Sequence, residues 1–313
     1  MTANPALASD ATVSVNDVSK WFGQKVAVSK LTCSFGRGVT GLLGPNGAGT
    51  TTLLRMLTGL IQPSEGDIEV LGTWPRSHPA VYARIGLVPE EDAVYPELTA
   101  REYVDYAATL SGVQPTGPAV ERALTQVELL DQADRRLAGY SKGMRQRAKV
   151  AAALVHEPEV LILDEPLNGT DPIQRARLIE LFRSFGDEGR TVIVSSHVLQ
   201  EVERMSERVI AIVDGKLAAA GNIAAIRRAM ADIPYRVRVG TDEPRRLGAA
   251  LLAEDLVHGV TVHDGELRIE TGDLFGLGTR LPELARTSGA RLILFRPEDE
   301  SLESVFRYLV GRR

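Results

Sequence analysis

Apolar and polar residues alternate along the first part of the chain in a pattern typical of β-strands. The alternation runs through TVSVNDVSKWF (12–22), stops at Gly23 and resumes in KVAVSKLTCSF (25–35). A period of two places successive side chains on opposite faces of a strand. We therefore expect these two segments to pair as an antiparallel edge of a larger sheet.

Short apolar runs and helical patterns alternate further along the chain. VTGLL (39–43) leads into a glycine-rich stretch, and TTLLRMLTGL (51–60) after it carries leucines at helical spacing. A second helical pattern, AKVAAALVHEPE (148–159), precedes three segments with the pattern of buried strands: VLILDEP (160–166), TVIVSSH (191–197) and VIAIVDGKL (209–217). Strands that alternate with helices indicate an α/β fold with a mostly parallel sheet.

Two further regions have patterns of their own. From about 97 to 145 the pattern is helical and richer in charge, and SGVQPTGP (111–118) is expected to join two helices. We interpret this region as a helical insertion. Residues 226–313 predict a small α+β domain. Its expected strand segments are PYRVRVG, GVTVHDGELRIET and ARLILFR, and its expected helices lie near RRLGAALLAE and LPELARTS. The final segment, SLESVFRYLVGRR, is expected to be an amphipathic helix.

Composition adds limits to this picture. The 313 residues suffice for a large domain and a smaller one, and 44% hydrophobic and 25% charged residues are ordinary for a globular protein. A net charge of -5 gives no reason to expect nucleic acid as a partner. Because no apolar run is long enough for a membrane span and the first residues lack a signal-peptide pattern, we expect a cytoplasmic location. Cys33 is the only cysteine, so an internal disulfide is excluded and we expect a buried apolar role.

The glycine-rich stretch GLLGPNGAGTTTLLRML (41–57) nearly fits a phosphate-binding loop. The pattern G-x-x-x-x-G-K-[ST] is met from Gly44 to Gly49, but Thr50 stands where the lysine belongs. Strand, glycine loop and helix follow one another as such a loop requires, because its backbone amides surround a phosphate at the start of the helix.

Two adjacent acids, Asp164 and Glu165, follow the apolar strand of VLILDEP. Ligands bind α/β sheets at the carboxyl ends of the strands, so carboxylates there are candidates for chemistry; an exposed strand end is the alternative. We assign Asp164 to Mg²⁺, directly or through an intervening group, and Glu165 to polarising the attacking water.

With these residues in place, the chain resembles the ATP-binding subunits of ABC transporters, most closely those that work with ABC-2-type permeases as exporters. The resemblance covers about residues 12–225 and rests on several motifs in the family's order. GPNGAGTT resembles the Walker A loop, YPELTARE follows the Q-loop region, YSKGMRQR resembles the ABC signature, LILDEP the Walker B strand, NGTDP the D-loop and SSH the switch histidine. It implies a P-loop NTPase ABC cassette at 12–225, with a mixed sheet, an antiparallel β edge and a helical insertion, followed by the accessory α+β domain at 226–313.

The resemblance also implies ATP and Mg²⁺ as ligands. The implied catalytic residues are Glu165 and His197, and the implied metal ligands are Thr51, Glu90 and Asp164. The implied nucleotide-binding residues are Phe22, Gly44, Pro45, Asn46, Gly47, Ala48, Gly49, Thr50, Thr51, Thr52, Glu90, Ser141, Gly143 and Asp171.

Some of these assignments have alternatives. Phe22 is preferred to Trp21 for stacking on adenine, although either could belong to the core. Glu90 occupies a position where the family usually has glutamine, and a solvated loop acid is the other interpretation of it. Arg145 and Arg147 are expected to be helix-face charges, and His156 is expected to be structural.

The family resemblance implies partners as well. Ser141 and Gly143 would close over the γ-phosphate held by a second cassette, Asp171 would join the two nucleotide sites, and His197 would contact the γ-phosphate. A complete site would then need two cassettes head to tail, as a homodimer or a heterodimer. The chain would pair with a separate ABC-2-type transmembrane permease on the cytoplasmic face of the cell membrane.

Thr50 changes this expectation because threonine is neutral and too short to bridge the β- and γ-phosphates. Loss of one preorganised charge costs on the order of 10²–10³ in rate, so hydrolysis is expected to be impaired more than ATP binding. A naturally degenerate site, an introduced substitution, and rescue by Lys142 of a facing subunit are three explanations. The main hypothesis is an ATP-hydrolysing exporter subunit; the alternatives are a non-hydrolysing regulatory subunit and, more weakly supported, a soluble ABC protein of translation or DNA repair.

Overall fold

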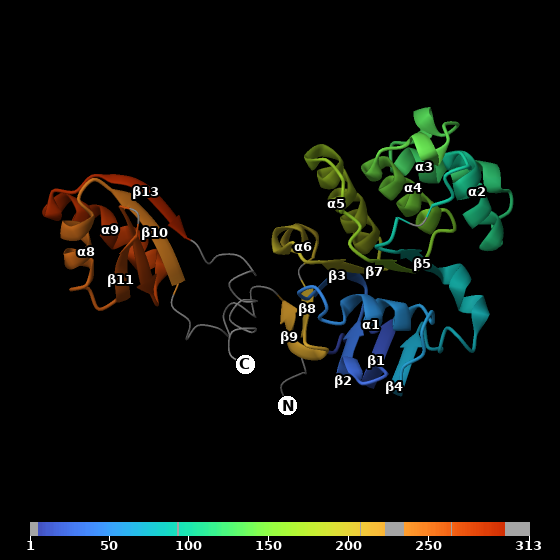
Figure 1. Ribbon diagram of the computed structural model, residues 1–313, viewed down its shortest axis with the longest axis horizontal. Helices are drawn as coiled ribbons and strands as arrows, with labels where there is room; N and C mark the ends of the chain where they lie inside the picture. The colour runs from blue at the N-terminus through green and yellow to red at the C-terminus, as the bar shows by residue number, and fades with distance from the viewer. Residues whose placement is uncertain (1–5, 93, 207, 223–234, 264, 298–313) are drawn as a thin grey trace. The chain divides into compact units, whose positions relative to one another are not determined.

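The computed structural model describes residues 6–92, 94–206, 208–222, 235–263 and 265–297 (Figure 1). By its internal contacts the chain divides into two compact units, Met1–Asn222 (unit 1) and Ile223–Arg313 (unit 2). Each unit is described by itself below.

The centre of unit 1 is a six-stranded sheet with the order β5-β6-β7-β3-β8-β9. The strands are parallel except for β9, which runs antiparallel to β8. Their bounds are β3 Gly38–Leu43, β5 Ile85–Val88, β6 Val160–Leu163, β7 Thr191–Ser196, β8 Arg208–Val213 and β9 Lys216–Asn222. The predicted mostly parallel sheet is confirmed.

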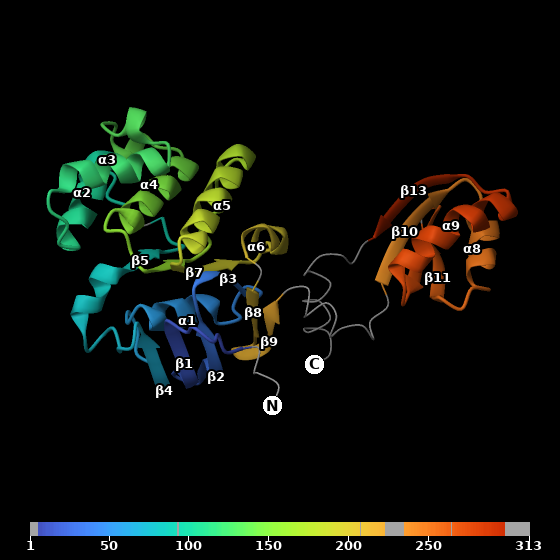
Figure 2. The same ribbon diagram turned by 180° about the vertical axis from the view of Figure 1, so that it is seen from behind.

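A second, three-stranded sheet in unit 1 has the order β2-β1-β4, with β1 Val13–Phe22, β2 Lys25–Phe35 and β4 Glu65–Val70. The predicted antiparallel pairing of 12–22 with 25–35 is confirmed. However, the strands form a sheet of their own instead of extending the larger one, because β4 occupies the other edge of β1. Helix α1, Thr50–Leu57, lies between the two sheets (Figure 2) and shares one apolar cluster with residues of both.

Helices cover the other face of the six-stranded sheet (Figure 1). Their bounds are α2 Ala100–Leu110, α3 Thr116–Gln126, α4 Lys142–Leu154, α5 Pro172–Asp187 and α6 Leu199–Met205, with short 3₁₀ helices at Pro79–Arg84, Leu130–Gln132 and Leu137–Gly139. Helix α2 begins with a reciprocal capping box between Thr99 and Glu102. The predicted break at 111–118 is confirmed, since α2 ends at Leu110, one residue before the segment, and α3 begins at Thr116, inside it.

Unit 2 is a four-stranded antiparallel sheet with the order β11-β12-β10-β13 and two helices. The bounds are β10 Tyr235–Thr241, α8 Pro244–Leu251, β11 Val257–His263, β12 Glu266–Thr271, α9 Leu274–Ser288 and β13 Leu292–Pro297. Alternate residues of β10 and β12 pack with α8 and α9 in one apolar cluster. The predicted α+β arrangement is confirmed, while the amphipathic helix predicted at 301–313 lies outside the described residues.

Two expectations from composition can be compared with this fold. Cys33 is buried, and burial raises the pKa of its thiol to about 12. Within the described ranges, no helix has the length and apolarity that crossing a membrane requires.

Candidate nucleotide-binding site

The glycine loop joins the end of β3 to the start of α1. Gly49 has φ +103° at the N-cap of α1, and a Cβ there would lie 2.3 Å from the Ala27 carbonyl oxygen. A Cβ on Gly44 would lie 2.9 Å from the Ile212 carbonyl oxygen. Side chains are therefore excluded at both positions, and the backbone passes close to its neighbours.

The start of α1 suits an anion. No side chain caps this helix, and its first turn carries no acidic residue. The positive end of the helix dipole consequently has no negative partner from the helix itself, which favours a phosphate group. Thr50, Thr51 and Thr52 form this first turn, and each is partly buried.

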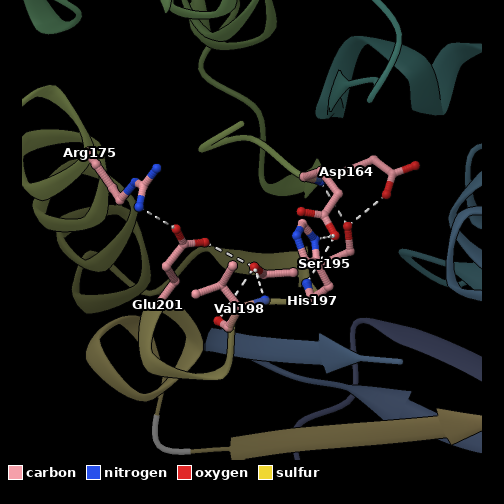
Figure 3. Close-up of polar contacts among 8 residues, drawn as sticks. Asp164, Arg175, Ser195, His197, Val198 and Glu201 are labelled. Atoms are coloured by element: carbon pink, nitrogen blue, oxygen red, sulfur yellow. Dashed lines mark hydrogen bonds and ion pairs between the residues drawn. The ribbon is translucent and has the colours of Figure 1, made fainter. Parts of the chain in front are cut away.

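Asp164 follows β6 and is only 4% exposed. Its Oδ1 accepts a hydrogen bond of 2.6 Å from Ser195 Oγ, at the end of β7 (Figure 3). Burial raises the pKa of Asp164, while hydrogen bonds from Ser195 and then Thr51 act in the opposite direction. The Ser195 hydroxyl was not predicted; two buried serines closing an apolar strand were the signal in the sequence.

These oxygens fit Mg²⁺ in the way that phosphate enzymes hold it. Mg²⁺ usually takes one or two protein oxygens and completes its coordination with water and substrate phosphates. Thr51 lies near enough to Asp164 to counter, in part, the rise that burial causes in the pKa of its carboxyl group. Across the part of the chain that is described, no group of three or more His, Cys, Asp or Glu residues could form an all-protein metal site.

Glu165 and His197, the predicted catalytic pair, contact each other. Glu165 Oε1 accepts a hydrogen bond of 3.0 Å from the His197 backbone N–H and lies 2.8 Å from His197 Nδ1. Burial raises the pKa of Glu165, and the interaction with His197 opposes this rise. Glu165 has φ +49°, an uncommon conformation for a residue with a side chain, and its N–H donates to Ser195 Oγ at 2.9 Å.

The arrangement of the sheet brings these groups together. Strands β6, β7 and β3 are neighbours in that order and run parallel, so their carboxyl ends meet at one edge. The glycine loop, the two acids and His197 follow those three strand ends. This edge is where α/β sheets bind ligands.

Glu90 is exposed, and it lies on a loop whose backbone is held by side chains of α4. The buried Lys149 donates from Nζ to the carbonyl oxygens of Pro89 at 2.8 Å and Glu91 at 2.7 Å, the two residues that flank Glu90. Arg145 forms an ion pair of 2.7 Å with Asp92 in the same loop. Lys149 was not predicted as a residue of this site, although a lysine in the apolar pattern AKVAAAL was a detectable signal.

The signature segment and the D-loop segment lie against each other within this chain. Ser141 caps α4 by accepting from the Met144 N–H at 3.2 Å. A Cβ on Gly143 would lie 3.0 Å from the Gly169 carbonyl oxygen, so the two backbones are in close contact. Asp171 caps α5 by accepting from two backbone N–H groups at 3.0 Å each. Both segments are thus placed by helix capping.

Phe22 and Trp21 are surface residues. Phe22 is 52% exposed and Trp21 is 40% exposed, so the alternative that either belongs to the core is wrong. The ammonium group of Lys20 lies 5.1 Å from the centre of the Phe22 ring.

The other residues weighed from sequence have contacts inside the protein. Arg147 donates to the carbonyl oxygens of Val127 and Glu128, both at 2.9 Å, and His156 Nε2 lies 3.1 Å from the Ile85 carbonyl oxygen. The contact of His156 supports the structural role expected for it, while Arg147, expected to be a helix-face charge, binds two backbone carbonyl oxygens inside the protein.

The fold and the glycine loop together define a P-loop nucleotide-binding cassette. Among solved structures, unit 1 is similar to one described as an ATP-binding subunit of an ABC transporter, with a TM-score of 0.65, 28% identity, and coverage of 70% of this chain and 93% of that one. A dimeric ATP-binding cassette bound to ADP and Pi has the same fold, with a TM-score of 0.63 and 22% identity over 67% of this chain and 98% of that one.

Curated relatives extend the similarity to nearly the whole chain. The family model described as ABC transporter matches residues 28–168. The linearmycin resistance ATP-binding protein LnrL of Bacillus subtilis is 34% identical, over 95% of this chain and 97% of its own. The bacitracin transport ATP-binding protein BcrA of Enterococcus faecalis is 33% identical, and the daunorubicin resistance ATP-binding protein DrrA3 of Streptomyces coeruleorubidus is 34% identical, each over 96% of both chains. The chain belongs to the family of ABC transporter ATP-binding proteins, which confirms the resemblance seen in its motifs.

Proposed function

We propose that this protein is the ATP-binding subunit that drives an ABC-2-type exporter, with hydrolysis impaired by Thr50. The observation that carries the proposal is the single sheet edge at which the glycine loop, Asp164, Glu165 and His197 meet. Relatives named for antibiotic transport or resistance support export as the process that ATP would drive.

The residues of the site have separable roles in this proposal. The amides at the start of α1 bind the phosphates, and Phe22 stacks on adenine. Thr51 and Asp164 hold Mg²⁺, with Glu90 near it as a further oxygen ligand. Bound Mg²⁺ neutralises charge on the phosphates during transfer.

Glu165 and His197 act on the attacking water. Glu165 accepts hydrogen bonds from both the backbone and the ring of His197, which fixes its carboxylate toward the strand ends. A carboxylate with a raised pKa is a better proton acceptor than an ordinary one at neutral pH. Glu165 therefore polarises the water, and His197 contacts the γ-phosphate.

A second cassette completes the site. Ser141 and Gly143 of one subunit would close over the γ-phosphate held by the other, and Asp171 would join the two sites. ATP would draw the cassettes together, and hydrolysis would release them. A separate permease, and hence a position on the cytoplasmic face of the membrane, belong to the same proposal.

The experiment that tests this function compares the unmodified chain with Thr50→Lys and with Thr50→Ser as an uncharged control. Steady-state Mg·ATP hydrolysis and ATP binding are measured for each, with the permease present. We expect Thr50→Lys to hydrolyse about 10²–10³ times faster, because a preorganised cation at the phosphates is worth that factor. Thr50→Ser should match the unmodified chain, and binding should differ less than turnover. Equal rates for all three chains would contradict our account of Thr50.

Thr50 also supports a second candidate, a non-hydrolysing regulatory subunit that closes on ATP without turnover. In that case the natural partner would be a different cassette with an intact lysine. Purification of the complex and sequencing of its ATP-binding subunits distinguish this heterodimer from a homodimer of the present chain.

A further inference from the structure

Ser196 and Glu201, two buried polar residues next to the loop of His197, are joined by a hydrogen bond. Ser196, the residue before His197, donates from Oγ to Glu201 Oε2 at 2.9 Å and accepts the Val198 N–H at 3.0 Å. Glu201 lies on α6 and is 7% exposed. The Glu201 carboxylate therefore holds the Ser196 hydroxyl, and this hydroxyl in turn accepts the N–H of Val198, the residue after His197 (Figure 3).

Arg175 of α5 extends these contacts to the D-loop segment. Arg175 Nη1 lies 3.3 Å from Glu201 Oε1, and Arg175 Nη2 donates to the Thr170 carbonyl oxygen at 3.4 Å. Thr170 precedes Asp171, the residue proposed to face the second cassette. One guanidinium thus joins Glu201 of α6, which holds Ser196, to the segment before Asp171, a bridge for which the forked geometry of arginine is suited.

An ion pair with a buried carboxylate is not explained by stability alone. Taking a carboxylate out of water is costly, and apolar side chains of similar volume often stabilise such a site as well or better. In this site the buried Arg175 Nε has no hydrogen-bond partner among the described residues. The pair is therefore incompletely satisfied, which favours a role in placing the Ser196 hydroxyl over a role in stability.

We propose that Glu201 is a positioning residue for His197 and that Arg175 links that position to the D-loop segment. This rests on the proposed ATPase function for its catalytic meaning. His197 is held from two sides, by Glu165 through its own N–H and ring, and by Glu201 through Ser196. A displacement of the segment around Thr170 would then be transmitted to the histidine loop through one arginine.

The first test is hydrogen exchange of the full chain without nucleotide, which does not depend on activity. Glu201→Ala should speed exchange at the amide of Val198 about tenfold, because the Ser196 hydroxyl that accepts this N–H loses its charged partner. Ser196→Ala should do the same, and the double variant should be no faster than either single one. Glu180→Gln, an exposed acid on α5, is the matched control and should leave this amide unchanged.

The second test is turnover in the Thr50→Lys background. Glu201→Gln keeps the size of the side chain and should lower kcat by about tenfold to a hundredfold, since misplacement of a catalytic group by about 1 Å has an effect of that order. KM for ATP should stay within about twofold, because the phosphate loop is untouched. Arg175→Lys keeps the charge but loses the fork, and should lower kcat while leaving the exchange of Val198 slow.

The outcomes separate the two proposals. If the Thr50→Lys chain fails to hydrolyse ATP, the proposed function is wrong, while the exchange result still decides whether Glu201 positions His197. An unchanged exchange rate at the Val198 amide in a folded Glu201→Ala chain would overturn the inference. Additive effects of Ser196→Ala and Glu201→Ala would overturn it too. Thermal unfolding of every variant checks folding, and Glu201→Gln replaces Glu201→Ala if the alanine chain does not fold.

Discussion

At the scale of single residues, environment separates two adjacent carboxylates. Asp164 accepts a hydrogen bond from Ser195 and is nearly inaccessible, whereas Glu165 contacts the half-exposed His197. Burial raises the pKa of both, but the partners differ: hydroxyls surround the first and an imidazole meets the second. Hydroxyls suit a metal ligand, and an imidazole suits a group that exchanges protons.

The raised pKa of Glu165 gives a pH dependence. The carboxylate must be deprotonated to polarise water, so turnover of the Thr50→Lys chain should fall on the acidic side at a higher pH than the ordinary glutamate pKa would give. Glu165→Gln should lower kcat by about 10²–10⁴ and remove this acidic limb. The measurement is kcat against pH for both chains; an identical acidic limb in the glutamine variant would contradict the role of Glu165.

Asp164→Asn tests the cost of a buried carboxylate. A raised pKa means that the folded state binds the proton more tightly than the unfolded state, so stability falls as pH rises from the unfolded pKa to the folded one. Asparagine removes this cost, and we expect its melting temperature to exceed that of the natural chain by about 2–4 °C at pH 8. The difference should shrink as pH is lowered through the pKa of Asp164. A lower melting temperature for the asparagine variant at pH 8 would show that its hydrogen bonds matter more than its charge.

At the scale of elements, α4 organises two distant parts of the site. Its N-terminus carries Ser141 and Gly143, while Lys149 and Arg145 along its length hold the loop around Glu90. A movement of this loop should consequently be felt by the signature segment, because one rigid helix bears both.

Lys149→Met tests this connection. Methionine keeps the length and apolar stem of lysine but cannot donate to the carbonyl oxygens of Pro89 and Glu91. We expect exchange at the amides of Glu90 and Glu91 to become about tenfold faster, while the core of β6 stays protected. Arg177→Met, which removes an exposed ion pair between α5 and Glu128 in the turn after α3, is the control. Unchanged exchange at Glu90 and Glu91 would mean that other contacts hold the loop.

At the scale of the whole molecule, the apolar cores follow the division of the chain. Two clusters lie entirely within residues 6–220, and a third lies within residues 237–292. No apolar cluster of the described residues includes side chains from both units. Each unit therefore buries its own core, as an independently folding domain does.

Truncation after Asn222 tests this independence. We expect residues 1–222 to fold and to bind ATP with an affinity within about threefold of the full chain, since the glycine loop and its supports lie inside unit 1. Calorimetry and ATP titration of both chains are the measurements. Loss of the cooperative transition in the shortened chain would show that unit 1 needs unit 2 to fold.

Much of this fold follows from local features of the sequence. Local alternation and helical spacing identified the strands and helices, and motif order identified the family, because neighbouring residues carry both signals. Glu165 and His197 were paired only through the family resemblance, and the structure then showed them in contact.

The contacts between residues that are far apart in the chain could be read only from the tertiary structure. β4 pairs with β1 although more than forty residues separate the paired positions along the chain. The alternation of polar and apolar positions does not specify which distant strand a given strand will pair with. Ser195 ends an apolar strand, Lys149 interrupts an apolar helical pattern and Glu201 is one of several charged residues of α6, and the partners of all three come from other elements. Burial gives each of them its role, since a polar group removed from water must find a partner wherever the fold provides one.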